Sequence, residues 1–175
     1  MAIAAVSELE TLIHKMVGHA AKLDASDLAQ VAEAVSRVFS VHADEVAILW
    51  VTPDRKFLRF VVPEQLRSVG QLPLTSSTAL AARTVREKRA EIVNHFNVVP
   101  HASVFEGVRL KEEHGEPIQK IMSAPISIGA MVIGVLQVSR KAKTAKEKPD
   151  FSTQNLKQLV SVAALLAPAV ALCEE

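Results

Sequence analysis

The chain has 175 residues, of which 49% are hydrophobic, and its 20 basic and 19 acidic side chains give a formal net charge of +1. This length suits one domain with a single core that needs no metal or disulfide. The even charge balance provides no overall field that would draw the protein to nucleic acid or to an anionic membrane.

The cysteine content and the length of the apolar stretches indicate in which compartment the protein is expected. The one cysteine, Cys173, excludes an internal disulfide and any multi-cysteine metal or redox centre within one chain. The start of the chain does not have the pattern of a secretion signal. The longest uncharged stretch, residues 159–173, is shorter than the roughly 20 residues needed to span a bilayer. We therefore expect a cytoplasmic protein with no membrane or nucleic-acid partner.

Two helices are predicted in the N-terminal part of the chain. The first should begin at a capping box of Ser7 and Glu10, and its apolar residues recur at steps of three and four as in a coiled-coil seam. These residues are Val6, Leu9, Ile13, Met16, Ala20 and Leu23. The second helix follows a polar break at 24–27, runs to about Phe39, and should pack one apolar face on a sheet. We therefore divide the chain into an N-terminal dimerisation helix, residues 1–24, and a single domain, residues 25–175.

The middle of the chain predicts a hairpin, a helix and a short strand. Residues 45–51 and 56–62 read as strands about a turn at Pro53 and Asp54. A helix capped by Ser77 or Thr78 should run to about residue 88, and a short strand should follow at 91–94.

The clearest pattern is a second hairpin, formed by residues 120–128 and 130–139 about Gly129. Its second strand is apolar at successive positions, whereas a strand with one wet face would alternate. We therefore expect both faces of the sheet to be covered. Residues 141–150 read as a mobile, solvated connector.

The last helix should begin near Ser152 and carries two apolar stripes at three-four spacing. One stripe can cover the sheet while the other meets a helix. The seam of the first helix matches it, so the two can pair within a monomer or form a four-helix homodimer interface, which we favour.

This order of elements resembles a GAF domain, a sensory module related to PAS domains, over about residues 28–170. The resemblance rests on SAPISIGAMVIGVLQVSRK, FSTQNLKQLVSVAALLA and STALAARTVREKRAEIVNHF. It implies an α+β fold: a central antiparallel sheet of five or six strands with helices on one face, ligand-pocket loops on the other, and the N- and C-terminal helices in a bundle. The chain has Ser77 and Asn94 where the family often has a glycine and an aspartate.

Three known kinds of GAF domain do not fit the residues present. Bilin-binding members attach the pigment through a cysteine near the pocket, whereas Cys173 is at the far end of the last helix. Members that reduce free methionine sulfoxide use several cysteines, because a second thiol must resolve the sulfenic acid. The signature of cyclic-nucleotide-binding phosphodiesterase modules is not visible in the sequence. The resemblance therefore implies a non-catalytic module whose ligand and cofactor are not identified.

Residues 94–117 are the expected pocket wall, because passive connections inside compact domains rarely exceed 12 to 15 residues. Its histidines can supply polar contacts, its phenylalanines an aromatic wall, and Arg109 a fork for a carboxylate or phosphate. Core packing of the phenylalanines, an ion pair of Arg109 with Glu112 or Glu113, and a helix-facing position for Met122 are the plainer alternatives. The candidate ligand-binding residues are His95, Phe96, His101, Phe105, Arg109 and Met122.

No metal site and no catalytic set is assigned. The histidine spacing matches no compact metal motif, and Ser123 and Ser127 lack the partners of an acyl-transfer nucleophile. We expect a sensory module that binds a small molecule and signals through a homodimer or a separate partner protein. The alternative is a GAF-fold scaffold for dimerisation without a ligand. An enzyme that uses the loop histidines is a third interpretation.

Overall fold

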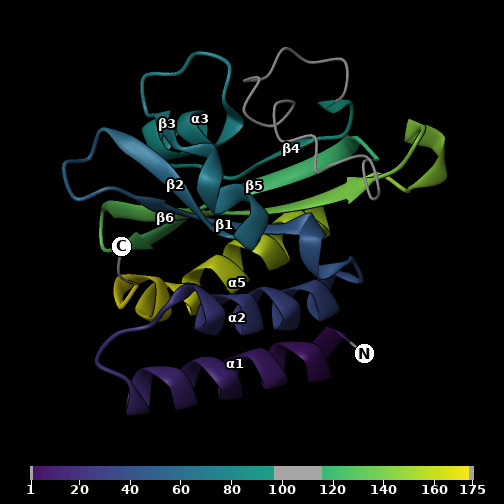
Figure 1. Ribbon diagram of the computed structural model, residues 1–175. Coiled ribbons are helices and arrows are strands. Elements are labelled where there is room, and N and C mark those ends of the chain that lie inside the picture. The colour runs from purple at the N-terminus through teal and green to yellow at the C-terminus, as the bar shows by residue number, and fades with distance from the viewer. Residues whose placement is uncertain (1, 97–115, 174–175) are drawn as a thin grey trace.

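A six-stranded sheet forms the centre of the computed structural model, which describes residues 2–96 and 116–173. Neighbouring strands pair antiparallel in the order β3-β2-β1-β6-β5-β4 (Figure 1). This confirms the predicted antiparallel α+β sheet. The strands are β1 Val46–Val51, β2 Phe57–Val62, β3 Gln71–Pro73, β4 Glu91–Val93, β5 Ile118–Ile128 and β6 Met131–Lys141.

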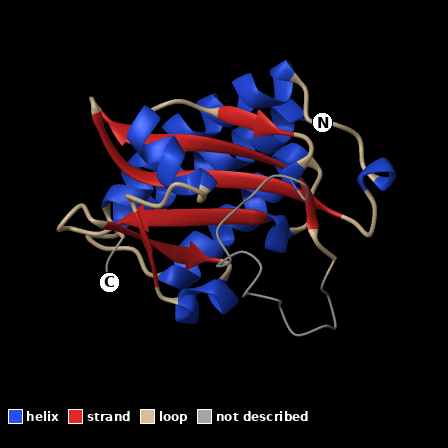
Figure 2. Cartoon of the chain, turned by 90° about the horizontal axis from the view of Figure 1, so that it is seen from above, coloured by secondary structure: helices blue, strands red, loops and turns tan. Residues whose placement is uncertain are grey.

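The helices cover the two faces of the sheet unequally. Helices α2 (Ala25–Phe39) and α5 (Thr153–Ala171) lie against one face, and α1 (Ala2–His19) packs outside them (Figure 1). Helix α3 (Leu80–Glu87) crosses the other face, as the view from above shows (Figure 2). We call these the helical face and the α3 face. No helix in the described ranges is long and apolar enough to cross a membrane.

Both faces of the sheet are buried, as the unbroken apolar pattern of β6 predicted. Leu136 belongs to the core on the helical face, which also contains Leu28, Val35 and Leu166. Its neighbour Val135 belongs to a second core on the α3 face. Because successive side chains of a strand point to opposite faces, a strand between two covered faces is apolar at every position.

The second hairpin is as predicted. Ile128 pairs with Met131, and the turn between them has Gly129 at a φ of +58°, a conformation open to glycine without strain. The first hairpin joins β1 and β2 at the expected place, with Arg55 at a φ of +60°.

Two predicted helix starts are wrong. Helix α1 already begins at Ala2, and Ser7 lies inside it, where its carbonyl oxygen accepts a bond from the Thr11 hydroxyl. The alanines before Ser7 are strong helix formers, so no cap is needed there. Helix α3 starts after Ala79, whose amide donates to the Ser76 hydroxyl rather than to Ser77 or Thr78.

The connector at 141–150 is mostly exposed, as predicted, and side chains of the sheet hold parts of its backbone. Ala142 is fully buried, and its carbonyl oxygen accepts a bond from Gln119 at 2.9 Å. Arg140 donates to the carbonyl oxygens of Pro149 and Asp150. Most of the lysine-rich segment is solvated, while the backbone oxygens of Ala142, Pro149 and Asp150 accept from side chains of the two long strands.

Candidate functional site

Three buried polar side chains lie together on the α3 face, and we call them the polar cluster. Thr84 comes from α3, Ser123 from β5 and Gln137 from β6, and each is at most 1% exposed. Ser123 and Gln137 are directly opposite each other in the antiparallel register, so their side chains share one face. Helix α3 packs on this face of the sheet and places Thr84 in contact with Ser123.

The hydrogen bonds of the polar cluster run in one direction. The Thr84 hydroxyl donates to the carbonyl oxygen of Leu80 at 2.9 Å, so it accepts at its 2.7 Å contact with the Ser123 hydroxyl. Ser123 then donates to Thr84 and accepts from Nε2 of Gln137 at 3.3 Å. In this arrangement Nε2 of the Gln137 amide faces Ser123, and Oε1 faces away from it.

The amide oxygen of Gln137 has no donor in this network. Gln137 Oε1 is buried and accepts no hydrogen bond from any group within residues 2–96 and 116–173. Gln119 Oε1, at the start of β5, is in the same condition. A buried acceptor without a donor costs about 1–3 kcal/mol, so an oxygen of this kind is expected to meet a donor from water or from a ligand.

Apolar residues flank the polar cluster on both sides. On one side are Val135 of β6 and Val85 of α3, and on the other are Leu80 and Ile121. A surface with few polar groups set between apolar ones is typical of small-molecule sites.

An ion pair lies next to the polar cluster. Glu91 of β4 pairs in register with Ser123, and its two carboxylate oxygens accept from Nε and Nη2 of Arg83 at 2.7 and 3.0 Å. The hydrogen bonds to Glu91 raise the pKa of Arg83 above its usual value. Because this contact is bidentate, it fixes the first residue of β4 against α3.

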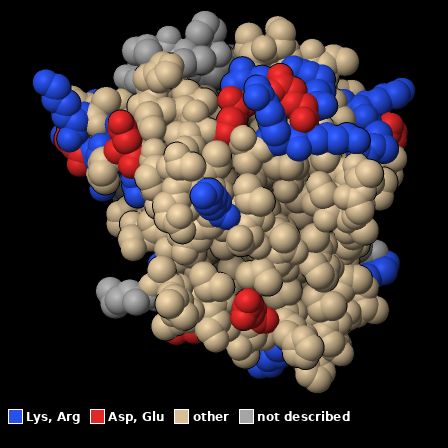
Figure 3. All heavy atoms as spheres, turned by 180° about the vertical axis from the view of Figure 1, so that it is seen from behind, with Lys and Arg blue, Asp and Glu red and all other residues tan. Residues whose placement is uncertain are grey.

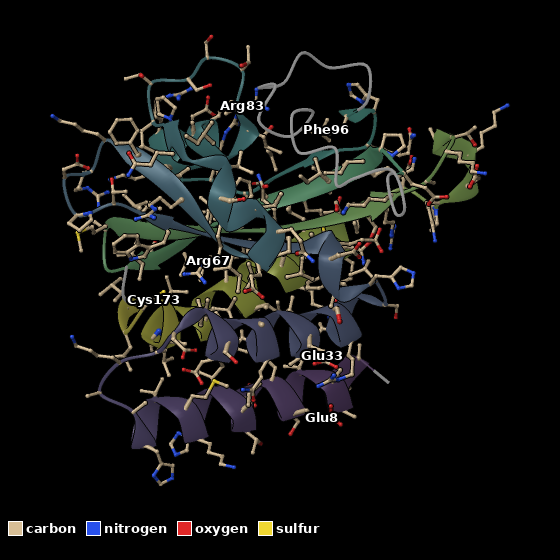
Figure 4. The ribbon with its side chains drawn as sticks, viewed as in Figure 1. Glu8, Glu33, Arg67, Arg83, Phe96 and Cys173 are labelled. Atoms are coloured by element: carbon tan, nitrogen blue, oxygen red, sulfur yellow. The ribbon has the colours of Figure 1, made fainter. Side chains whose placement is uncertain are left out.

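The structure separates the residues that the sequence predicted for the ligand site. Phe96 is buried on the α3 face with Leu80, Val93 and Ile121, and in Figure 4 it lies on the same side of the sheet as Arg83. His95, the residue before it, is exposed. His101, Phe105 and Arg109 are outside the described residues.

Met122 faces away from this site. It is fully buried in the core of the helical face, while its neighbours Ile121 and Ser123 face α3. The two-residue period of a strand determines this separation. The plainer interpretation of Met122 as a core residue is therefore the one that the structure supports, and we leave it out of the site.

Sequence reasoning did not select the polar cluster. The sequence predicts no role for Thr84 or Gln137, and it offers Ser123 only as a nucleophile without partners. The available signal was the interruption of two apolar strands by polar residues that fall opposite each other once the hairpin register is known.

Asn94, at the position where the family often has an aspartate, has a structural role. Its Nδ2 donates to the carbonyl oxygen of Phe151 at 3.1 Å, and its Oδ1 accepts from the Phe151 amide at 2.9 Å. This pair of bonds attaches the end of β4 to the segment before α5.

Solved structures of low sequence identity share this fold. The GAF domain of an Acinetobacter phosphoenolpyruvate-protein phosphotransferase matches with a TM-score of 0.64 and 15% identity, over 94% of this chain and 91% of that one. Residues 122 to 287 of a methyl-accepting chemotaxis protein match with a TM-score of 0.69 and 15% identity, over 93% and 94%. The free methionine-R-sulfoxide reductase of Neisseria meningitidis, solved with its substrate, matches with a TM-score of 0.62 and 14% identity, over 95% and 88%.

Comparison at the level of sequence gives the family. None of the curated protein sequences matches the chain. The sequence pattern of the GAF domain matches residues 22–171, which include α2, all six strands, α3 and α5. The chain therefore belongs to the GAF domain family.

Proposed function

We propose that this chain is a non-catalytic sensory or regulatory module that binds a small molecule without a covalent bond on the α3 face. The observation that carries the proposal is the buried, unpartnered amide oxygen of Gln137 within the described part of the chain. The large majority of buried polar atoms in folded proteins have a hydrogen-bond partner, and an apolar side chain at this position would avoid the cost of an unpartnered oxygen. Family membership supports the regulatory role, because GAF domains are commonly sensory parts of signalling proteins.

The polar cluster specifies one property of the ligand. Since Ser123 and Thr84 use their protons within the cluster and Gln137 Oε1 has no donor, a ligand at the cluster needs an N–H or O–H donor. The apolar flank formed by Leu80, Ile121 and Phe96 favours an apolar body beside that donor. His95, His101, Phe105 and Arg109 stay candidates for further contacts from the sequence.

The cysteine supports a role without thiol chemistry. One GAF-fold relative is a methionine-R-sulfoxide reductase, and thiol-based reduction of a sulfoxide needs a second thiol to resolve the sulfenic acid. This chain has one cysteine, and burial raises the pKa of the Cys173 thiol, which disfavours the reactive thiolate.

The test is a ligand screen that compares the wild type with a Gln137→Met variant. Methionine keeps the shape of the side chain but removes the unpartnered oxygen. Without ligand, the free energy of unfolding of the variant should therefore be at most about 1 kcal/mol below that of the wild type, or higher than it. A metabolite library followed by differential scanning fluorimetry should give at least one compound that raises the Tm of the wild type. The same compound should have a much smaller effect on the variant.

A Val138→Ala variant is the matched control. Val138 follows Gln137 on the same strand but faces the core of the helical face, so its truncation should lower stability while the compound still binds. The proposal fails if no compound raises the Tm of the wild type. It also fails if Gln137→Met binds every compound as tightly as the wild type does.

We further propose that the module acts as a homodimer through the outer face of α5, in contact with the same face of a second copy. The apolar stripe of α1 packs within the chain, since Leu9 and Ile13 are buried against α2 and α5. The outer residues of α5 are exposed and mostly uncharged, namely Val160, Ala164, Pro168 and Ala171. Figure 3, the view from behind, shows a broad central area with few charged side chains.

A further inference from the structure

A groove lies at the end of the molecule where the turn of the β5–β6 hairpin meets α3 and the β1–β2 turn. Its volume is about 330 Å³, and its walls are formed by Arg55, Val85, Lys88, Ala130, Met131 and Val132. None of these residues belongs to the polar cluster.

Two cations border the groove and lack carboxylate partners. Arg55 donates to the carbonyl oxygen of Val132 at 3.0 Å, and Lys88 donates to that of Ala130 at 3.2 Å. Within the described ranges, neither makes an ion pair with an acidic side chain. Since a carbonyl oxygen carries no net charge, both side chains keep their full positive charge available to an anion.

The positions of these two cations follow from their backbone bonds. Ala130 is in the turn and Val132 is the second residue of β6, so the bonds to their carbonyl oxygens hold both charged groups at the same end of the hairpin. Figure 3 shows basic side chains predominating at the end of the molecule that carries α3. Arg83 and Arg89 contact Glu91 and Glu87, whereas the two cations that line the groove, Arg55 and Lys88, contact backbone oxygens.

An exposed apolar surface adjoins the cations. Met131 is 50% exposed and Ile128 is 47% exposed, and these two are among the four large apolar side chains that are exposed in the described part of the chain. They are cross-strand partners next to the turn, so they present one continuous surface. Val85 and Val132 also line the groove, but they are buried residues of the core on the α3 face.

We propose that this groove is a docking site for an acidic segment of a partner protein. The segment would place carboxylates at Arg55 and Lys88 and lay an apolar side chain on Met131. Charge complementarity selects an acidic partner, and the exposed apolar pair selects one that also carries an apolar residue. The open form of the groove favours a polypeptide, because small-molecule sites bury most of the ligand surface. The site is independent of the small molecule proposed above.

The test measures binding of a fluorescein-labelled peptide composed of Glu, Leu and Gly by fluorescence anisotropy. The variant is Arg55→Asn/Lys88→Asn, since both positions have left-handed backbones, with φ of 60° and 53°, which asparagine adopts readily. The matched control, Lys143→Gln/Lys146→Gln, removes the same charge from the exposed connector at the opposite end of the hairpin. Loss of two charge-assisted contacts should weaken binding about tenfold or more in the first variant and little in the second.

Further peptides and a Met131→Ser variant complete the experiment. Replacing Glu by Gln, or Leu by Ser, in the peptide should weaken binding to the wild-type chain, and so should Met131→Ser. Equal affinity of the two charge variants would overturn the proposal, as would binding of the Gln peptide at full strength. The assignment to a polypeptide would be overturned if the wild type bound single-stranded DNA more tightly than the peptide and the Arg55→Asn/Lys88→Asn variant did not bind the DNA. It would also be overturned if the wild type were a dimer and only the Arg55→Asn/Lys88→Asn variant were a monomer, because the groove would then be an interface between two copies of the chain.

Discussion

Gly134 is the position in β6 where the sheet has no room for a side chain. A Cβ built there would lie 2.6 Å from the carbonyl oxygen of Leu49 on the neighbouring strand and 3.3 Å from Val170 Cγ1 of α5. The first of these atoms is backbone and cannot rotate away. The absence of a side chain lets α5 pack closely on the centre of the sheet.

Gly134→Ala should therefore lower the free energy of unfolding by about 1–3 kcal/mol, because overpacking forces the strand or the helix to shift. Urea denaturation followed by circular dichroism measures this change. Gly18→Ala is the matched control, since nothing lies within 4 Å of its Cβ position in α1. There the same substitution should raise stability by about 0.5–1 kcal/mol through helix propensity. Equal effects at both glycines would contradict the packing argument.

Asn94 and Asn155 use different atoms of their side-chain amides. Asn94 uses both its oxygen and its nitrogen to connect the end of β4 to Phe151. Asn155, in the first turn of α5, uses only its oxygen, which accepts from the amide and the hydroxyl of Ser152. An aspartate at either position would keep the accepting oxygen and would lose the amide nitrogen.

Asn94→Asp should cost about 1–3 kcal/mol at neutral pH, because a carboxylate would face the carbonyl oxygen of Phe151 where a donor is needed. That contact raises the folded-state pKa of the new carboxyl above its unfolded value of about 3.9. The variant should therefore approach wild-type stability as the pH falls to about 4, where the protonated carboxyl donates again.

Asn155→Asp is the comparison for this element. It keeps both acceptor bonds and adds a negative charge at a helix N-terminus, so it should be neutral or stabilising at pH 7. Urea titrations at the two pH values measure both variants. A loss of stability at Asn94 that does not depend on pH would argue against the lost donor as its cause.

At the scale of the whole molecule, the proposed homodimer predicts different results for two exposed apolar residues. Val160 is 50% exposed on the outer face of α5, and Ile3 is 87% exposed near the start of α1. In a contact between two copies of the α5 face, Val160→Glu would bury like charges near the two-fold axis and should give monomers. Ile3→Glu should remain dimeric.

Light scattering of the intact protein and both variants decides the question. A monomeric wild type would remove the homodimer from the proposed function while the ligand site could stand. A dimer that only Ile3→Glu disrupts would place the interface on α1 instead.

The sequence supported the fold well because the fold depends on local patterns. The turn at Gly129, the doubly apolar strand β6 and the stripes of the terminal helices follow from residues close in the chain. The predicted start of α1 at Ser7 was wrong, because the helix propensity of the residues before it outweighed the capping pattern.

The sequence by itself determined the antiparallel sheet, its two covered faces and the resemblance to the family. Only the tertiary structure placed Met122 on the helical face, and only it brought Thr84, Ser123 and Gln137 into one chain of hydrogen bonds. Strand period and turn chemistry act between near neighbours, so they can be read along the chain. The direction of a hydrogen bond, and an acceptor left without a donor, depend on strand register and on a helix that crosses the sheet, which no short stretch of sequence contains.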